Sequence, residues 1–322
     1  MSTSRPEIPR AGGQRQNWSE LPGSIVEEIE VFLGDQIISA TTLPGGFSPG
    51  IAARLTTSSG QHRFVKAVSS EVNADAVRFH RREIRVCTGL NAIPELPVPS
   101  LLWSFDAEDS PWTVLMFEHI NGRQPAEPWV DAELDRCVDA LNDLASKLAP
   151  TPLSLPVVEP VRIEGASGTN PWPSLRCRLG SVSDQQILQL ADLCADVPAA
   201  LQGNSLLHSD LRADNMLLGD DGQVYTVDWP HASIGASWVD PLCMVPSVEM
   251  QGGPSAGELF DRFDAARDAD DDAVTTVLAA IAGYFVSYSL EPEIPSLPGL
   301  RAFQAAQGAV SMRWLGQRLG WT

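Results

Sequence analysis

Residues 206–215 read LLHSDLRADN and place an aspartate, Asp210, five positions before an asparagine, Asn215, after an apolar run. In a loop of the form H-x-D-x-x-x-x-N, the aspartate orients a substrate hydroxyl and accepts its proton. The asparagine of such a loop holds a magnesium ion that bridges the phosphates of ATP. The spacing therefore predicts phosphoryl transfer, with Asp210 as catalytic base and Asn215 as metal ligand.

The residues after this loop predict a hairpin that ends in a second carboxylate. MLLG at 216–219 and QVYTVDW at 223–229 flank the turn Asp220-Asp221-Gly222, and such a turn between two apolar runs is typical of two paired strands. Asp228 lies at the end of the second run. Because Mg²⁺ prefers hard oxygen ligands, we expect Asp228 to bind the same metal as Asn215.

At this point the chain resembles the aminoglycoside phosphotransferase and choline kinase group, small-molecule kinases built on the protein-kinase fold. That group has V-D-W where protein kinases have D-F-G, and this sequence has VDWP at 227–230. The stretches WPHASIGASWVDPL (229–242) and RAFQAAQG (301–308) are similar to an actinobacterial branch of the group, to which we assign no substrate. The resemblance implies a protein-kinase-like, two-lobed α+β fold, with ATP and Mg²⁺ as cofactors.

We expect a small antiparallel β lobe and a larger, mainly helical lobe. The predicted division is a disordered leader at 1–20, an N-terminal nucleotide-binding lobe at 21–120, and a C-terminal catalytic and substrate-binding lobe at 121–322. Hydrophobic periodicity predicts helices at 23–33, 75–90, 131–148, 187–197, 274–290 and 300–314, and strands at 37–43, 51–57, 62–68 and 111–120.

A lysine in the third predicted strand is a candidate for binding the nucleotide. Lys66 lies in RFVKAV between apolar residues, and a charge in an apolar strand needs a partner. By resemblance to V-A-I-K strands, Lys66 would contact ATP phosphates and pair with Glu83, with Glu71 as the less favoured partner. The alternative is that these residues are solvated surface charges.

Two backbone features complete the expected nucleotide site. The segment PGGFSPG at 44–50 suits a flap over phosphates, because glycine permits close backbone approach; Gly45, Gly46, Phe47 and Ser48 are its candidate contacts. A plain turn is the competing interpretation. By resemblance, the interlobe hinge would bind the adenine ring through the main chain of Phe117 and His119.

Other polar residues near the loop are candidates for supporting roles. Arg212 could stabilise charge on the transferring phosphoryl group, or it could form a salt bridge with Asp214 or a distant carboxylate. His208 is expected to brace the loop, and Asp240 resembles a buried aspartate that hydrogen-bonds it. His231 is interpreted as structural.

Composition limits the partners and the compartment. The 322 residues are 43% hydrophobic and 20% charged, which is typical of a globular protein, and the net charge of −19 disfavours nucleic acid as a partner. A cationic small molecule would be attracted, although an acidic surface also aids solubility. Five scattered cysteines and the absence of an apolar leader or spanning segment predict a cytoplasmic protein without a disulfide framework, a zinc site or a membrane partner.

These features predict an ATP-dependent phosphotransferase that moves the γ-phosphate to a hydroxyl of a small molecule, with an aminoglycoside-type antibiotic as one candidate acceptor. The alternatives are a metabolic small-alcohol kinase, of the choline, homoserine or sugar type, and a nucleotide-binding pseudokinase. A protein kinase ranks last, because no A-P-E-like segment follows VDW. The acidic run at 258–272 is interpreted as a solvated loop or the start of a helix, with an amine-binding pocket as the alternative. The sequence does not indicate an oligomeric state.

Overall fold

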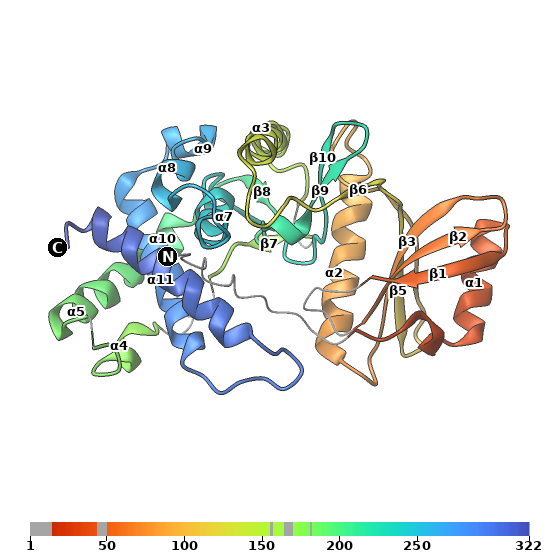
Figure 1. Cartoon of the computed structure of the whole chain (residues 1–322), viewed down its shortest axis with the longest axis horizontal. Helices are drawn as coiled ribbons and strands as arrows, with labels where there is room; N and C mark the ends of the chain where they lie inside the picture. Colours follow the sequence, from red (N-terminus) through yellow and green to blue (C-terminus); the bar gives the residue numbers. More distant parts are fainter. Residues whose placement is uncertain (1–14, 44–49, 155–156, 164–169, 181, 322) are drawn as a thin grey trace, which may run out of the picture.

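The computed structural model describes residues 15–43, 50–154, 157–163, 170–180 and 182–321. A lobe built on an antiparallel sheet lies beside a larger, mainly helical lobe (Figure 1). This is the predicted two-lobed α+β architecture. The predicted phosphate flap, with Gly45, Gly46, Phe47 and Ser48, lies outside the described residues.

Five described strands of the smaller lobe form one antiparallel sheet in the order β1-β2-β3-β5-β4. Because side chains alternate between the faces of a strand, Val65 and Ala67 of β3 join the core beneath α1, while Lys66 points to the opposite face. That opposite face packs against α2. The elements of this lobe are η1 (Trp18–Glu20), α1 (Gly23–Leu33), β1 (Ile37–Thr42), β2 (Ile51–Thr57), β3 (His62–Ser69), α2 (Ala74–Leu90), β4 (Leu101–Asp106) and β5 (Trp112–Glu118).

Strand β4, at the edge of the sheet, was not predicted. Its residues alternate between intermediate and exposed positions, so neither face shows the fully buried run that marks β5. The alternation of Trp103 and Phe105 with Ser104 and Asp106 is nevertheless a period-two signal. The proline-rich segment before it obscured that signal in the sequence.

The predicted disordered leader is also wrong in its last residues, where Trp18–Glu20 forms the 3-10 helix η1. Asn17 and Glu20 form a capping box, which satisfies backbone donors at the start of a helix. The Trp18 amide donates to Thr42 Oγ1 at 3.1 Å. The end of the leader is thereby fixed beside the strand that enters the glycine-rich segment.

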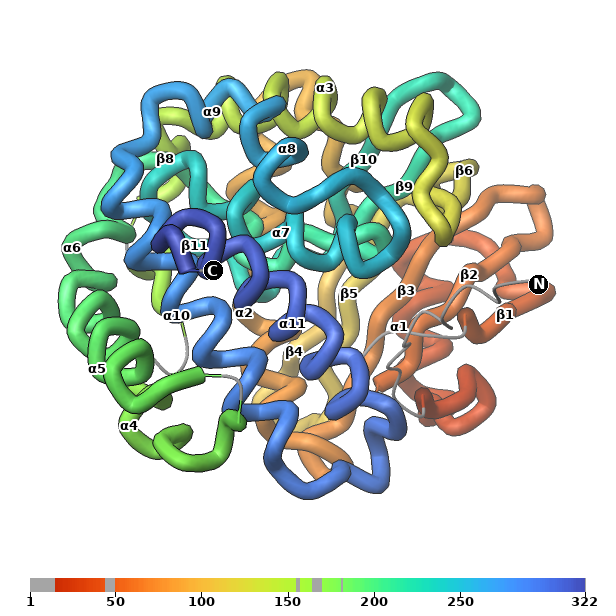
Figure 2. The backbone as a smooth tube through the Cα atoms, turned by 60° about the vertical axis from the view of Figure 1, so that its left-hand side comes forward, coloured from red at the N-terminus to blue at the C-terminus, as the bar shows by residue number. Residues whose placement is uncertain are grey.

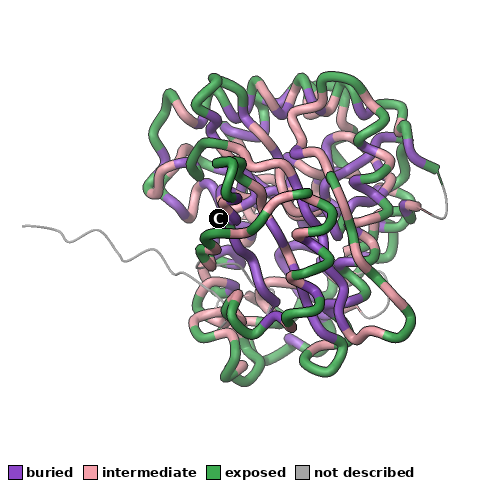
Figure 3. Tube along the Cα trace, turned by 90° about the vertical axis from the view of Figure 1, so that its right-hand side faces the viewer, coloured by how far each residue is buried: buried purple, intermediate pink, exposed green. Residues whose placement is uncertain are grey.

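The larger lobe is built around the antiparallel pair α10 and α11, which run side by side in both ribbon views (Figures 1 and 2). Exposed positions gather on the outside of the molecule and buried positions lie toward its interior (Figure 3). The helices of the larger lobe are α3 (Asp131–Lys147), α4 (Trp172–Leu175), α5 (Asp184–Leu193), η2 (Cys194–Asp196), α6 (Val197–Ala200), η3 (Ala213–Asn215), α7 (Val239–Met250), α8 (Ala256–Phe260), α9 (Asp264–Arg267), α10 (Asp271–Ser289) and α11 (Leu300–Arg318).

Short strands of the larger lobe flank the segments that contain the predicted site residues. They are β6 (Gly122–Arg123), β7 (Glu159–Pro160), β8 (Ser205–Leu207), β9 (Met216–Gly219), β10 (Val224–Thr226) and β11 (Ser233–Gly235). Strands β9 and β10 form the predicted hairpin. Gly222 in its turn has φ +88°, a conformation that glycine adopts without the steric cost of a side chain.

The acidic run at 258–272 spans α8, α9 and the start of α10. Asp270 caps α10 by accepting a hydrogen bond from the Ala273 amide at 2.8 Å, and Arg267 pairs with Asp264 within α9. These contacts agree with the interpretation of the run as solvated surface and helix start. Among the described residues, no helix has both the length and the apolar character needed to cross a membrane.

Candidate active site

The loop between β8 and η3 is held by a partly buried carboxylate. Asp240, in the first turn of α7, accepts hydrogen bonds from the backbone amides of His208 at 2.7 Å and Ser209 at 2.8 Å. His208 Nε2 lies 2.9 Å from the Val227 carbonyl, which ties the loop to the hairpin. Burial lowers the pKa of His208, so the neutral imidazole is favoured near neutral pH. Both side chains therefore brace the loop.

Asp210 and Asn215 meet at the centre of this loop. The Asn215 amide nitrogen donates to the Asp210 backbone carbonyl at 2.8 Å and to its Oδ2 at 3.1 Å. Asn215 is almost fully buried, whereas 30% of the Asp210 side chain is exposed. The bonds fix the partly exposed Asp210 carboxylate and leave the Asn215 side-chain oxygen as the atom that could bind a metal.

Arg212 is placed so that both interpretations of its role have a structural basis. Its Nε and Nη2 each lie 2.9 Å from a carboxylate oxygen of Asp214, which is the salt bridge considered from the sequence. Its Nη1 also lies 3.5 Å from Asp210 Oδ1. The guanidinium is thus shared between two carboxylates, one of them the predicted base.

Lys66 joins two carboxylates that are far from it in the sequence. Its Nζ lies 2.7 Å from Glu83 Oε1 and 2.8 Å from Asp228 Oδ1. Glu83 is 2% exposed, whereas 45% of the Asp228 side chain is exposed. The favoured partner Glu83 is therefore the one that Lys66 contacts, and the lysine reaches across to the hairpin that carries Asp228.

The charges of this cluster shift one another's pKa values. Burial alone would lower the pKa of Lys66, but Asp228 and Glu83 outweigh it and raise that pKa, so the ammonium stays charged. Against the opposing effect of burial, Lys66 lowers the pKa of Asp228. Burial raises the pKa of Asp210, with Arg212 opposing. Asp228 is therefore ionised, and Asp210 is a stronger base than an ordinary aspartate.

The backbone is unusual at two places in the site. Ser209 has φ +64° and Asp228 has φ +70°, in the left-handed region that residues other than glycine seldom adopt. Such conformations cost of order 1–3 kcal/mol and cluster at functional sites. Here they lie immediately before the predicted base and at the predicted metal ligand.

Comparison with known proteins identifies the family of this chain. Residues 39–275 match the Phosphotransferase enzyme family. This chain belongs to that family. The match covers most of the chain and includes Lys66, Glu83, Asp210, Asn215 and Asp228, so the prediction of a phosphotransferase acting on a hydroxyl is confirmed by the family. No curated protein matches significantly.

Solved structures confirm the kinase-like fold of this phosphotransferase. A spectinomycin phosphotransferase in complex with ADP and spectinomycin is 14% identical, with a TM-score of 0.59 over 90% of this chain and 97% of the other. An amicoumacin kinase in complex with AMP-PNP and Ca²⁺ is 12% identical, with a TM-score of 0.56 over 92% and 95%. A choline kinase from Streptococcus pneumoniae is 14% identical, with a TM-score of 0.57 over 90% and 98%.

The residues of the phosphotransferase fit a magnesium ion that is shared with phosphates. Asp228 and the side-chain oxygen of Asn215 could supply two hard oxygen ligands. In proteins Mg²⁺ is commonly held by one or two carboxylates together with substrate phosphates and water. Within the described ranges, no group of three or more His, Cys, Asp or Glu side chains could hold a metal. Two oxygen donors, one from Asp228 and one from Asn215, fit a metal that also binds nucleotide phosphates.

The predicted hinge of the phosphotransferase follows β5. Phe117 pairs with Phe64 of β3 and Leu101 of β4, so both edges of its main chain face a neighbouring strand. His119 lies one residue beyond the end of β5, with its ring 5.7 Å from that of His62. Of the two predicted adenine contacts, His119 is the one whose backbone has left the sheet.

The sequence did not indicate Arg15, Phe79 or Arg82 as residues near the site, and His231 was assigned only a structural role. Arg15, in the predicted leader, lies close enough to Asp228 for that carboxylate to oppose the lowering of the arginine pKa by burial. The exposed His231 packs its ring against Phe79 at 4.9 Å, and Arg82 reaches the same segment. No local pattern identifies these contacts, because the partners are distant in sequence.

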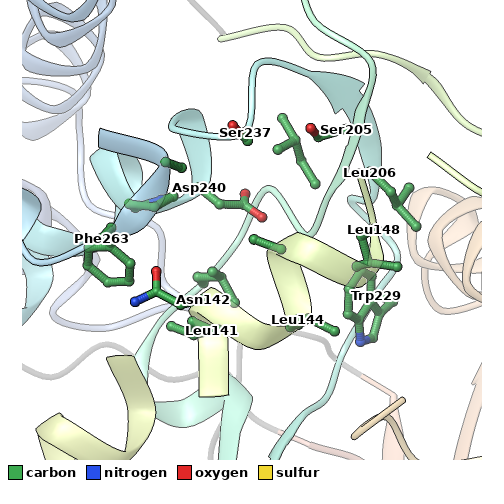
Figure 4. A pocket seen from close by; sticks show the side chains of 15 residues that line it. Leu141, Asn142, Leu144, Leu148, Ser205, Leu206, Trp229, Ser237, Asp240 and Phe263 are labelled. Carbon is green, nitrogen blue, oxygen red and sulfur yellow. The ribbon is translucent and has the colours of Figure 1, made fainter. Parts of the chain in front are cut away.

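A small cavity lies behind the catalytic loop, where Asp240 sits among the labelled side chains with Leu144 and Trp229 (Figure 4). Its volume of about 30 Å³ is enough for a water molecule but not for a nucleotide or an acceptor. We therefore regard it as part of the support for the loop and not as the substrate site.

Proposed function

We propose that this protein transfers the γ-phosphate of ATP to a hydroxyl group of a small molecule. The observation that carries the proposal is the contact of Lys66 with both Glu83 and Asp228, close to the hydrogen-bonded pair Asp210 and Asn215. This arrangement provides a phosphate-binding cation, two metal-ligand oxygens and a base. Phosphoryl transfer requires positioning and charge stabilisation, which these groups supply.

Asp210 would act on the acceptor. Its exposed carboxylate, held by Asn215, can accept a hydrogen bond from the acceptor hydroxyl and take its proton as the oxygen attacks phosphorus. The raised pKa of Asp210 favours this proton transfer. Arg212, shared between Asp210 and Asp214, would stabilise negative charge that develops on the transferring group.

Lys66, Asn215 and Asp228 would act on the nucleotide. Lys66 would hold phosphate oxygens while Glu83 keeps its ammonium in place. Asn215 and Asp228 would hold Mg²⁺, which when bound neutralises charge on the phosphates. The backbone at His119 would receive the adenine ring, and the segment with Gly45, Gly46, Phe47 and Ser48 would cover the phosphates.

The acceptor we propose is a cationic, hydroxylated small molecule. The support is the net charge of −19, because a negative field raises the local concentration of cations. Two of the similar structures are named for antibiotics and one for choline. An aminoglycoside-type antibiotic and a metabolic amino alcohol are the two acceptor classes to compare, in a cytoplasmic setting.

The test is acceptor-stimulated ATP consumption with the purified full chain and Mg²⁺. The panel contains aminoglycosides, macrolides, sugars and amino alcohols, and Lys66→Met is the matched blank because it lacks the phosphate-binding ammonium. We expect one class to stimulate the wild type and not the variant, with phosphorylated acceptor detected by mass spectrometry. A wild type that binds Mg²⁺ and ATP but stays silent with every compound would favour the pseudokinase alternative.

A further inference from the structure

The helix that carries Glu83 is anchored unequally along its length. In the second half of α2, Val86, Cys87 and Leu90 are buried in the large core that extends into the helical lobe. The first half contributes only Ala76 and Val77 to a small separate cluster with Val68. Because Glu83 lies between the two halves, contacts of the first half other than this apolar packing also help to set its position.

Those contacts reach across to the segment that follows Asp228. Arg82 Nη2 donates to the Ala232 carbonyl at 2.7 Å, and the Phe79 ring packs against the His231 ring at 4.9 Å. Glu83 Oε1 itself accepts from the Trp229 amide at 3.3 Å. Residues three and four apart share one face of a helix, so residues 79, 82 and 83 form one face of α2 that contacts residues 229–232.

Arg82 differs from its neighbours on the helix. Arg81 pairs with Asp106 at the protein surface, and Arg85 is exposed. Arg82 is partly buried, and burial lowers its pKa, with Glu159 opposing. A charged group withdrawn from water needs a compensating partner, which the Ala232 carbonyl supplies. Burial of this guanidinium costs free energy. A functional role for the contact with the Ala232 carbonyl would account for that cost.

We propose that Phe79 and Arg82 are positioning residues that clasp α2 to residues 229–232 and thereby hold Glu83, Lys66 and Asp228 together before nucleotide binds. The inference rests on the proposed function, because it assigns the clasp to the nucleotide site. The clasp joins a helix of the first lobe to a segment of the second. It keeps the lysine and glutamate paired through the contacts of one face of α2.

The first test is Arg82→Ala in the full chain, with Arg85→Ala as the matched control on the same helix. Loss of a hydrogen bond from a charged group predicts a fall of about tenfold or more in kcat/KM for ATP, whereas the control should stay within about twofold. Arg82→Lys keeps a charged donor and should recover much of the loss. A merely structural role would lower Tm without this recovery in kcat/KM.

The second test needs no activity and therefore separates the clasp from the proposed function. Hydrogen exchange of the amides in residues 74–83 should be faster in Arg82→Ala than in Arg85→Ala, because the first half of α2 loses one of its contacts with residues 229–232. Phe79→Ala, at a side chain that is 37% exposed, should give the same change if the arginine variant does not fold. Exchange equal to the control in both variants would overturn the clasp, even if the wild type transfers phosphate. Faster exchange in a protein that never binds Mg²⁺ and ATP would support the clasp as a structural contact and reject its assignment to a nucleotide site.

Discussion

Replacing Glu83 by glutamine removes one charge from the Lys66 cluster with little change in shape. Both carboxylate oxygens lie within 3.0 Å of Lys66 Nζ, and Glu83 is 2% exposed. A hydrogen bond to a charged group contributes roughly 1.5–3 kcal/mol. Glutamine keeps one acceptor oxygen, so we take the lower part of that range, about 1.5–2 kcal/mol. At 1.4 kcal/mol per tenfold change, kcat/KM for ATP should fall roughly 10–30-fold.

A second effect of Glu83→Gln follows from the remaining ion pair. Lys66 would then have Asp228 as its one charged partner in the cluster, so the lysine would compete more strongly with Mg²⁺ for that carboxylate. The concentration of Mg²⁺ that gives half-maximal rate should therefore rise. Steady-state kinetics over a range of ATP and Mg²⁺ concentrations measures both effects.

Glu71→Gln is the matched control, because Glu71 is exposed and was the less favoured partner from the sequence. It should leave both parameters within about twofold of the wild type. If Glu83→Gln behaved like Glu71→Gln, the contact between Lys66 and Glu83 would have no role in catalysis, and the reasoning above would be refuted.

Three further predictions concern the catalytic side chains. Asp228→Asn should abolish Mg²⁺-dependent binding of AMP-PNP in calorimetry, and an unchanged Mg²⁺ titration would remove Asp228 as a ligand. The pKa of Asp210 is raised by burial, so kcat/KM should fall as the pH is lowered through a pKa above that of an ordinary aspartate; a flat acid limb would contradict this. Arg212 lowers that pKa and Asp214 raises it, so Arg212→Ala should move the acid limb to higher pH and Asp214→Asn to lower pH. An acid limb that stays in place or moves to lower pH in Arg212→Ala would show that Arg212 does not act on Asp210.

The features predicted best are those whose residues lie close together in the chain. Asp210 and Asn215 belong to one loop, and their spacing of five residues leads directly to the hydrogen bonds between them. The hairpin around Gly222 was likewise readable from its turn residues and flanking apolar runs. Local patterns of this kind need no knowledge of the rest of the fold.

The contacts of Lys66 were harder to predict from the sequence. Lys66 and Asp228 are 162 residues apart, so no periodicity links them, and their common role came from the resemblance to a family. Arg82 could not be singled out, because its partner is a backbone carbonyl 150 residues away. Any residue type can supply such a carbonyl, so the sequence carries no trace of the contact.

Burial also could not be predicted from residue type alone. Lys66 and Arg212 retain only 15% and 18% of their side-chain exposure, which is unusual for charged residues. Each is buried beside two carboxylates. The sequence gives the identities of these charges, but their pKa shifts depend on how the two lobes bring them together.

The central claim is that Asp210 acts on the acceptor while Lys66, Asn215 and Asp228 hold the nucleotide. The most direct test compares Asp210→Asn with the wild type in two assays, AMP-PNP affinity with Mg²⁺ and the rate of phosphoryl transfer to an active acceptor. We predict an affinity within about threefold of the wild type and a rate lower by about 10²–10⁴-fold, the usual contribution of a general base. A variant that transfers phosphate as fast as the wild type would contradict the assignment.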